Sequence, residues 1–139
     1  MPPSLLARET ALLTANRRHL LQALQGSGLT QIQVRYGGRH GRCTHCLVST
    51  TPSDALITLQ NTPVTQHTLG SALGKEGTVT TSLLAALKEF SLHWVELQQR
   101  HWTRDDGGDG IMTIEVSSCR FTLEHNAHLT ENFCYRLVD

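Results

Sequence analysis

The sequence predicts an α+β fold, in which two amphipathic helices cover one face of an antiparallel sheet of about five or six strands. Residues 1–139 are interpreted as a single domain, the usual organisation for a chain of this length. Two segments place leucines every three or four residues, as on one face of a helix. Short runs of alternating apolar and polar residues follow each segment, as in half-buried strands. This order of helix, strands, helix, strands is typical of helices packed on one side of a sheet.

The two helices are the longest periodic segments. The first begins after Ser4 and carries its leucine stripe as far as Leu24. Residues 26–28 read Gly-Ser-Gly and end it, because glycine accepts the left-handed conformation of a helix C-terminus. The second is predicted to start near residues 81–82 and to keep its apolar stripe as far as Trp102.

The strands are predicted from alternation and from the turn residues that bound them. The interval 37–42 is rich in glycine and is interpreted as a hairpin turn, whereas 64–80 shows no clean period and is predicted to be a long loop. The predicted strands are residues 31–36, 43–50, 56–59, 112–116, 119–125 and 133–138.

The charge balance argues against some classes of partner. Twelve basic residues match twelve acidic ones, whereas a protein that binds duplex nucleic acid normally has a net basic face. We therefore expect nucleic acid not to be the partner. The eight histidines are more informative, because small changes of environment can charge them near neutral pH.

The sequence favours a cytoplasmic protein with no membrane segment. No stretch approaches the roughly 18 apolar residues that a spanning helix needs. The N-terminus has no basic region followed by an apolar one, so it does not resemble a secretory signal. The four cysteines are accordingly interpreted as reduced thiols.

The segment His40-Gly41-Arg42-Cys43-Thr44-His45-Cys46 contains the candidate zinc site. Cys43, Cys46 and His40 are ligand types that tetrahedral zinc binds well. We expect no cofactor, and zinc is the one that this segment could hold. A redox pair or two small structural thiols are the alternatives. Simple alternation along an extended strand would point Cys43 and Cys46 to opposite faces, which argues against shared coordination.

Two charged turns form the candidate partner surface. The first hairpin is basic and the turn after the second helix is acidic, and adjacent surfaces of opposite charge favour a charged protein partner. The acidic turn could instead hold a hard cation or be a solvated turn. The partner-binding candidates are Arg35, Arg39, His40, Arg42, Asp105, Asp106 and Asp109.

The second half of the chain resembles a bacterial family of unknown function that is carried by plasmids and integrative elements. The resemblance rests on a Trp-x-x-x-Asp-Gly-x-x-Gly turn at 102–110 and a Leu-x-x-Asn hairpin at 123–126. The family's first hairpin reads Gly-x-Gly-Asp-Ser-Gly, whereas residues 37–42 here read Gly-Gly-Arg-His-Gly-Arg. The acid of that turn has been replaced by basic residues.

The resemblance implies an accessory protein of a mobile element, acting on a host component such as a defence system. Together with the two charged turns, it predicts a small interaction or regulatory protein rather than an enzyme. A homodimer is compatible with this prediction. The alternative is a zinc-binding protein or a metal-dependent hydrolase that uses Cys43 and Cys46.

Overall fold

The computed structural model describes residues 5–69, 76–104, 106–127 and 133–138, so Ser4 lies outside the described residues. The predicted α+β class is confirmed. The elements are α1 (Leu5–Gln25), β1 (Gln31–Arg39), β2 (Arg42–Thr51), α2 (Leu56–Asn61), β3 (Pro63–Leu69), β4 (Glu76–Ser82), α3 (Leu83–Gln98), β5 (Gly108–Glu115), β6 (Arg120–Ala127) and β7 (Phe133–Val138).

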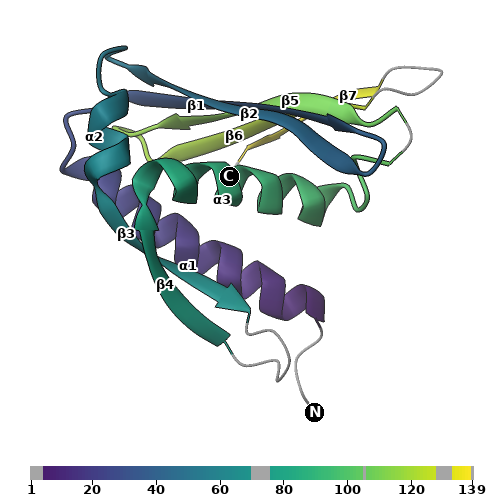
Figure 1. Ribbon diagram of the computed structural model, residues 1–139, viewed down its shortest axis with the longest axis horizontal. Helices are drawn as coiled ribbons and strands as arrows, with labels where there is room; N and C mark the ends of the chain where they lie inside the picture. Colours follow the sequence, from purple (N-terminus) through teal and green to yellow (C-terminus); the bar gives the residue numbers. More distant parts are fainter. Residues whose placement is uncertain (1–4, 70–75, 105, 128–132, 139) are drawn as a thin grey trace.

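Five strands form the main sheet in the order β2-β1-β5-β6-β7, and every neighbouring pair is antiparallel. The long helices α1 and α3 both lie on one side of this sheet (Figure 1), as the sequence predicts. No helix in the described part of the chain covers the opposite face (Figure 1). The strands β3 and β4 form a separate two-stranded sheet that packs against α1 and α3.

The core forms where α3 meets the inner face of the sheet. The predicted alternation is confirmed in β1, where Ile32, Val34 and Tyr36 are buried. The predicted start of α3 is also confirmed, because the Ser82 hydroxyl caps the helix by accepting a hydrogen bond from the Ala85 N–H at 3.1 Å. The buried residues of α3 are Leu83, Ala86, Leu87, Phe90, Ser91, Trp94 and Val95.

The helix α1 packs against α3 and β3, and one of its side chains contacts the start of β6. The Arg17 guanidinium lies 4.8 Å from the centre of the Phe121 ring and donates to the Cys119 carbonyl at 3.1 Å. The helix ends as predicted, with Gly28 in the left-handed region at φ +81°. None of the described helices has the length and apolar character that crossing a membrane requires.

Two predictions between β2 and α3 are wrong. Residues 56–59, predicted as a strand, belong to the short helix α2, whose Leu59 is fully buried. A four-residue apolar run fits either period, and packing against α3 decides in favour of the helix. Residues 64–80, predicted as a loop, include most of the β3–β4 hairpin. The alternation of apolar and polar residues cannot be seen in this hairpin, because its sheet is largely exposed and many of its positions are polar Thr and Gln residues.

The boundaries near the two charged turns also differ from the prediction. Gly37 and Gly38 are paired strand residues, and the turn between β1 and β2 consists of His40 and Gly41. The helix α3 ends at Gln98, so Trp102 is not part of it, although Trp102 is buried.

Candidate functional site

The basic hairpin and the acidic turn lie side by side at one end of the sheet. The Gly41 N–H, at the tip of the β1–β2 hairpin, donates to the Thr103 carbonyl at 2.9 Å. Immediately beside it, the β1–β5 register pairs Gly37 with Asp109 and Gly38 with Gly108. Two segments more than sixty positions apart in the sequence are thus joined by main-chain hydrogen bonds.

Glycines make this junction possible. Gly107 has φ +69°, and a Cβ atom there would lie 1.8 Å from the Gly38 carbonyl oxygen. A Cβ atom on Gly38 would lie 2.7 Å from the Arg42 carbonyl oxygen and 3.1 Å from the Trp102 ring. These backbones therefore approach more closely than any residue with a side chain would allow.

An aromatic cluster supports the junction from below. The Trp102 ring packs edge-on against both Tyr36 and His125, with ring centres 5.2 and 5.7 Å apart. The Tyr36 hydroxyl forms a buried hydrogen bond with His125 Nδ1 at 2.8 Å. A Cβ atom on Gly110, which lies between these two residues in the sheet, would be 2.3 Å from that hydroxyl. The cluster therefore fills the space beneath the end of the sheet that carries the two turns.

Above this support lies an open depression of about 360 Å³, here called the hairpin pocket. It brings together predicted partner-binding residues from both turns, with Arg39 and His40 from the hairpin and Asp106 and Asp109 from the acidic side. Arg39, His40 and Asp106 are exposed, and Asp109 is half-buried. The full lining is Gly37, Gly38, Arg39, His40, Thr44, His45, Asp106, Gly108 and Asp109.

The remaining predicted partner-binding residues surround the hairpin pocket less closely. Arg35 is exposed on β1 and lines a neighbouring depression with His45 and Asp109. Arg42 is exposed at the start of β2 but does not line the hairpin pocket. Asp105 lies outside the described residues.

The cysteine pair is arranged differently from the sequence expectation. The β1–β2 register shifts between Gly37 and Gly38, so that Cys43 pairs with Gly38 and Cys46 with Tyr36. Gly38 and Tyr36 share one face of β1, so this bulge places both cysteines on the same face of β2. The prediction of opposite faces is wrong because the extra residue, Thr44, interrupts the alternation.

The two thiols nevertheless differ in environment. Cys43 is exposed, whereas Cys46 is half-buried against α3. Burial raises the pKa of the Cys46 thiol, and the nearby Cys43 adds to this rise. A hydrogen bond with Ser91 and the charge of Lys88 both lower the pKa and so oppose the rise. No set of three His, Cys, Asp or Glu side chains that could hold a metal ion occurs among the described residues.

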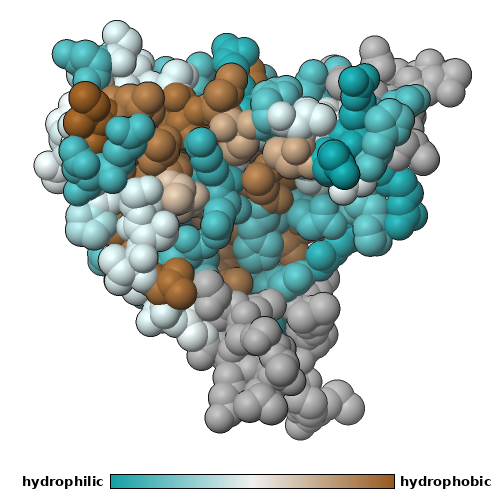
Figure 2. Space-filling model, in the orientation of Figure 1, coloured by the Kyte–Doolittle hydropathy of each residue, from teal (hydrophilic) through white to brown (hydrophobic). Residues whose placement is uncertain are grey.

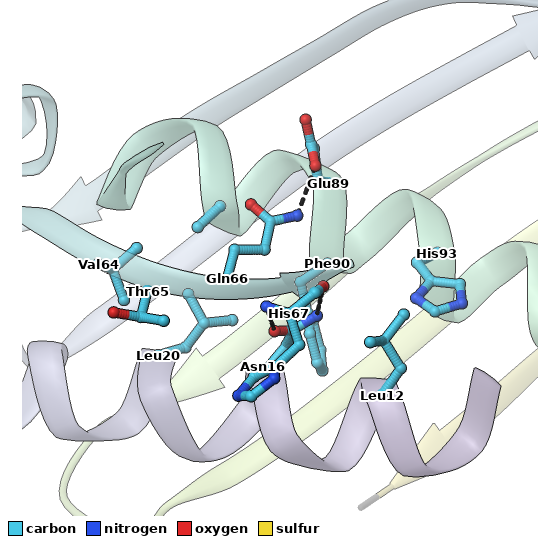
Figure 3. Close-up of a pocket in the computed structure, with 11 residues that line it drawn as sticks. Leu12, Asn16, Leu20, Val64, Thr65, Gln66, His67, Glu89, Phe90 and His93 are labelled. Carbon is cyan, nitrogen blue, oxygen red and sulfur yellow. Dashed lines mark hydrogen bonds between the residues drawn. The ribbon is translucent and has the colours of Figure 1, made fainter. Parts of the chain in front are cut away.

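A second depression, of about 200 Å³, lies between α1, β3 and α3 (Figure 3). Its floor is apolar and includes Leu20 and Phe90, while Glu89 and His93 line it from α3. Figure 3 shows the Asn16 side chain of α1 joined to the main chain of His67 on β3 by two hydrogen bonds. The sequence predicts neither this depression nor the Asn16 contact, because it predicts a loop over residues 64–80, which include most of β3.

Apolar side chains also gather on the surface near α2 and the adjoining part of the sheet (Figure 2). Among the described residues, the most exposed large apolar ones are Ile57 on α2, at 67%, and Leu47 on β2, at 63%. Exposed apolar residues are ordinary on protein surfaces, so this region by itself indicates no function.

Sequence reasoning missed two kinds of residue in the hairpin pocket. His45 lies in the candidate zinc segment, and its ring lies across Gly37, where a Cβ atom would be 2.2 Å from Cε1. A two-residue turn at 40–41 predicts Thr44 opposite Gly37, and the bulge at Thr44 moves this pairing to His45, so the sequence carries no signal for it. The structural glycines were interpreted as a loop, because glycine-rich segments usually are.

Comparison with known proteins adds one finding. A family model described as a family of unknown function (DUF6878) matches residues 12–137. The resemblance seen in the sequence agrees with this match at the level of a family without an assigned activity. No curated protein and no solved structure matches the chain.

Proposed function

The chain belongs to this family of unknown function, and we propose that it is an interaction protein whose hairpin pocket binds a charged protein partner. The observation that carries the proposal is the junction of the basic hairpin with the acidic turn, made by the Gly41–Thr103 hydrogen bond and the β1–β5 register. Charges of both signs are thereby presented together at one end of the sheet.

The chemistry of this surface suits recognition of a protein. Arg39, His40 and Asp106 are exposed and lie around the depression, so they can steer a partner before contact and select its orientation. Because charges of both signs are close together, a partner that carries one sign alone meets repulsion as well as attraction. We therefore expect a partner surface with complementary acidic and basic groups.

The biological setting that we propose is the cytoplasm of a bacterium, with the protein acting as an accessory factor of a mobile element on a host system such as defence. Support for this part comes from the sequence resemblance to plasmid and integrative-element proteins, and from the balance of acidic and basic residues. The partner would then be a host protein.

The test is affinity capture from the native host, followed by binding measurements with the captured protein after its purification. The variant Arg39→Glu/Arg42→Glu should weaken binding at least about tenfold, roughly 1.4 kcal/mol. Asp106→Lys should weaken it by a similar factor. The matched control is Arg120→Glu, a charge reversal at the opposite end of the sheet. Equal binding by all four proteins would refute the proposed surface.

A zinc-binding function of Cys43 and Cys46 is the second candidate, and the bulge that places both on one face of β2 favours it. Structural zinc takes four protein ligands and catalytic zinc three, so further ligands would have to come from beyond this pair. Elemental analysis of protein purified without added metal tests it. A zinc content near one equivalent, lost in Cys43→Ser/Cys46→Ser, supports this function, and a content far below one equivalent opposes it.

A further inference from the structure

Two histidines from different elements meet beside the second depression. His19 on α1 and His67 on β3 have their Nε2 atoms 3.0 Å apart. Their ring centres lie 5.0 Å apart, and the ring planes are inclined by 29°. Both side chains are half-buried, so solvent and small ions can reach them.

The contact between two ring nitrogens has a strict chemical requirement. A neutral imidazole nitrogen carries either a proton or a lone pair. Two lone pairs or two N–H groups facing one another at this distance would repel, so a positive centre must lie between the nitrogens. That centre is either a shared hydrogen-bond proton or a metal ion, and imidazole is a good ligand for zinc, nickel and copper.

The surrounding contacts hold one of the two ligands in place. The Asn16 side chain donates from Nδ2 to the His67 carbonyl at 3.1 Å, and its Oδ1 accepts from the His67 N–H at 2.6 Å (Figure 3). Asn16 and His19 are three positions apart and therefore lie on one face of α1. These bonds hold the His67 main chain against α1, so less freedom is lost when an ion joins the two side chains.

We propose that His19 and His67 bind a divalent transition-metal ion of the zinc, nickel and copper class, with water completing its coordination. The ion would bridge α1 and β3 through the two Nε2 atoms. Because β3 and β4 form a separate two-stranded sheet, such a bridge would strengthen the attachment of this hairpin to the rest of the fold. The site is separate from the hairpin pocket and from Cys43 and Cys46.

The test uses the full chain in a Cys43→Ser/Cys46→Ser background, so that thiols do not compete for the ion. Nickel chloride and zinc chloride are titrated by calorimetry, and thermal unfolding is followed with and without each metal. We expect one equivalent of metal to bind with a dissociation constant in the micromolar range and to raise the unfolding temperature. His19→Gln and His67→Gln should each weaken binding at least about tenfold.

The matched control is His101→Asn, which removes an exposed histidine after α3 at a position whose φ of +60° asparagine tolerates, and it should leave metal binding unchanged. Far-UV circular dichroism checks the fold of each variant. Should His67→Gln fail to fold, His19→Gln decides, because glutamine suits a half-buried helical position. The proposal is overturned if the background protein binds neither ion, or if His19→Gln binds as tightly as its parent. In both cases the contact is a hydrogen bond between two imidazoles.

Discussion

Tyr36 on β1 and His125 on β6 form a buried hydrogen bond across the intervening strand β5, with the Tyr36 oxygen 2.8 Å from His125 Nδ1. The residue that lies between them in the sheet is Gly110. Because Gly110 has no side chain, the two rings can meet over β5 and stack with their planes 10° apart. Trp102 closes the cluster from the edge. The hydrogen bond thus links β1, which leads into the basic turn, to β6, which pairs with the strand that follows the acidic turn.

Removal of the Tyr36 hydroxyl should therefore destabilise the protein. Tyr36→Phe keeps the ring and its packing but deletes one partner of a buried hydrogen bond, which typically costs about 1–2 kcal/mol. Urea denaturation at pH 7.5 measures the change in the free energy of unfolding. Arg120→Ala, an exposed substitution, is the control and should stay within about 0.5 kcal/mol of the wild type. A Tyr36→Phe protein as stable as this control would show that the hydrogen bond contributes nothing.

Two glycines with the same backbone conformation should respond differently to alanine. Gly41 and Gly107 both have positive φ, at +81° and +69°, so each substitution carries the left-handed strain of about 1–2 kcal/mol. Chain neighbours apart, no atom of the described residues lies within 4 Å of a Cβ atom at Gly41, whereas one at Gly107 would be 1.8 Å from the Gly38 carbonyl oxygen. Gly107→Ala should consequently cost about 2 kcal/mol more than Gly41→Ala in urea denaturation. Equal losses would contradict the close approach of the two turns.

The stability of the fold should decrease at acidic pH in part because of His93. This side chain is half-buried on α3, and burial lowers its pKa; Glu9 opposes the shift and Arg100 adds to it. The unfolded chain takes up the proton near the ordinary value of 6.5, before the folded protein does. The contribution of neutral His93 to stability is therefore complete above pH 6.5. It is lost as the pH falls through the pKa of His93 in the folded state.

His93→Gln should flatten this pH dependence. Urea midpoints of the variant and the wild type should diverge as the pH falls from about 7.5 to about 5, with the variant losing less. Each protein serves as its own control at the upper pH, where the wild-type imidazole is neutral. Parallel curves over the whole range would show that His93 does not contribute.

The two cysteines of β2 should differ in reactivity. The thiolate is the nucleophile, and burial raises the pKa of Cys46, so less of it is ionised near neutral pH. Cys43 is exposed. Alkylation by iodoacetamide at pH 7.5, mapped by mass spectrometry, should modify Cys43 several times faster than Cys46. Comparable rates would mean that Cys46 is not shielded by α3 in solution.

Sequence patterns were sufficient for the elements that bury a continuous apolar face. The alternation of Ile32, Val34 and Tyr36 and the leucine stripe of residues 83–95 predict a strand and a helix that the structure confirms. They succeed because burial on one face imposes a period that is visible in a single segment. The β3–β4 hairpin has no such face, since most of its described residues are exposed or half-buried, and it was missed.

The sequence by itself determined the α+β class, the long helices, the strands of the main sheet and the opposite charges of the two turns. Tertiary structure alone decided that these turns meet, that Thr44 forms a bulge, and that His19 faces His67. The physical reason is that each of these features depends on contacts between segments far apart in the chain. Gly38 is the clearest case. It lies in a glycine-rich segment that suggests a loop. Its lack of a side chain is nevertheless what allows Gly107 and Trp102 to pack against it.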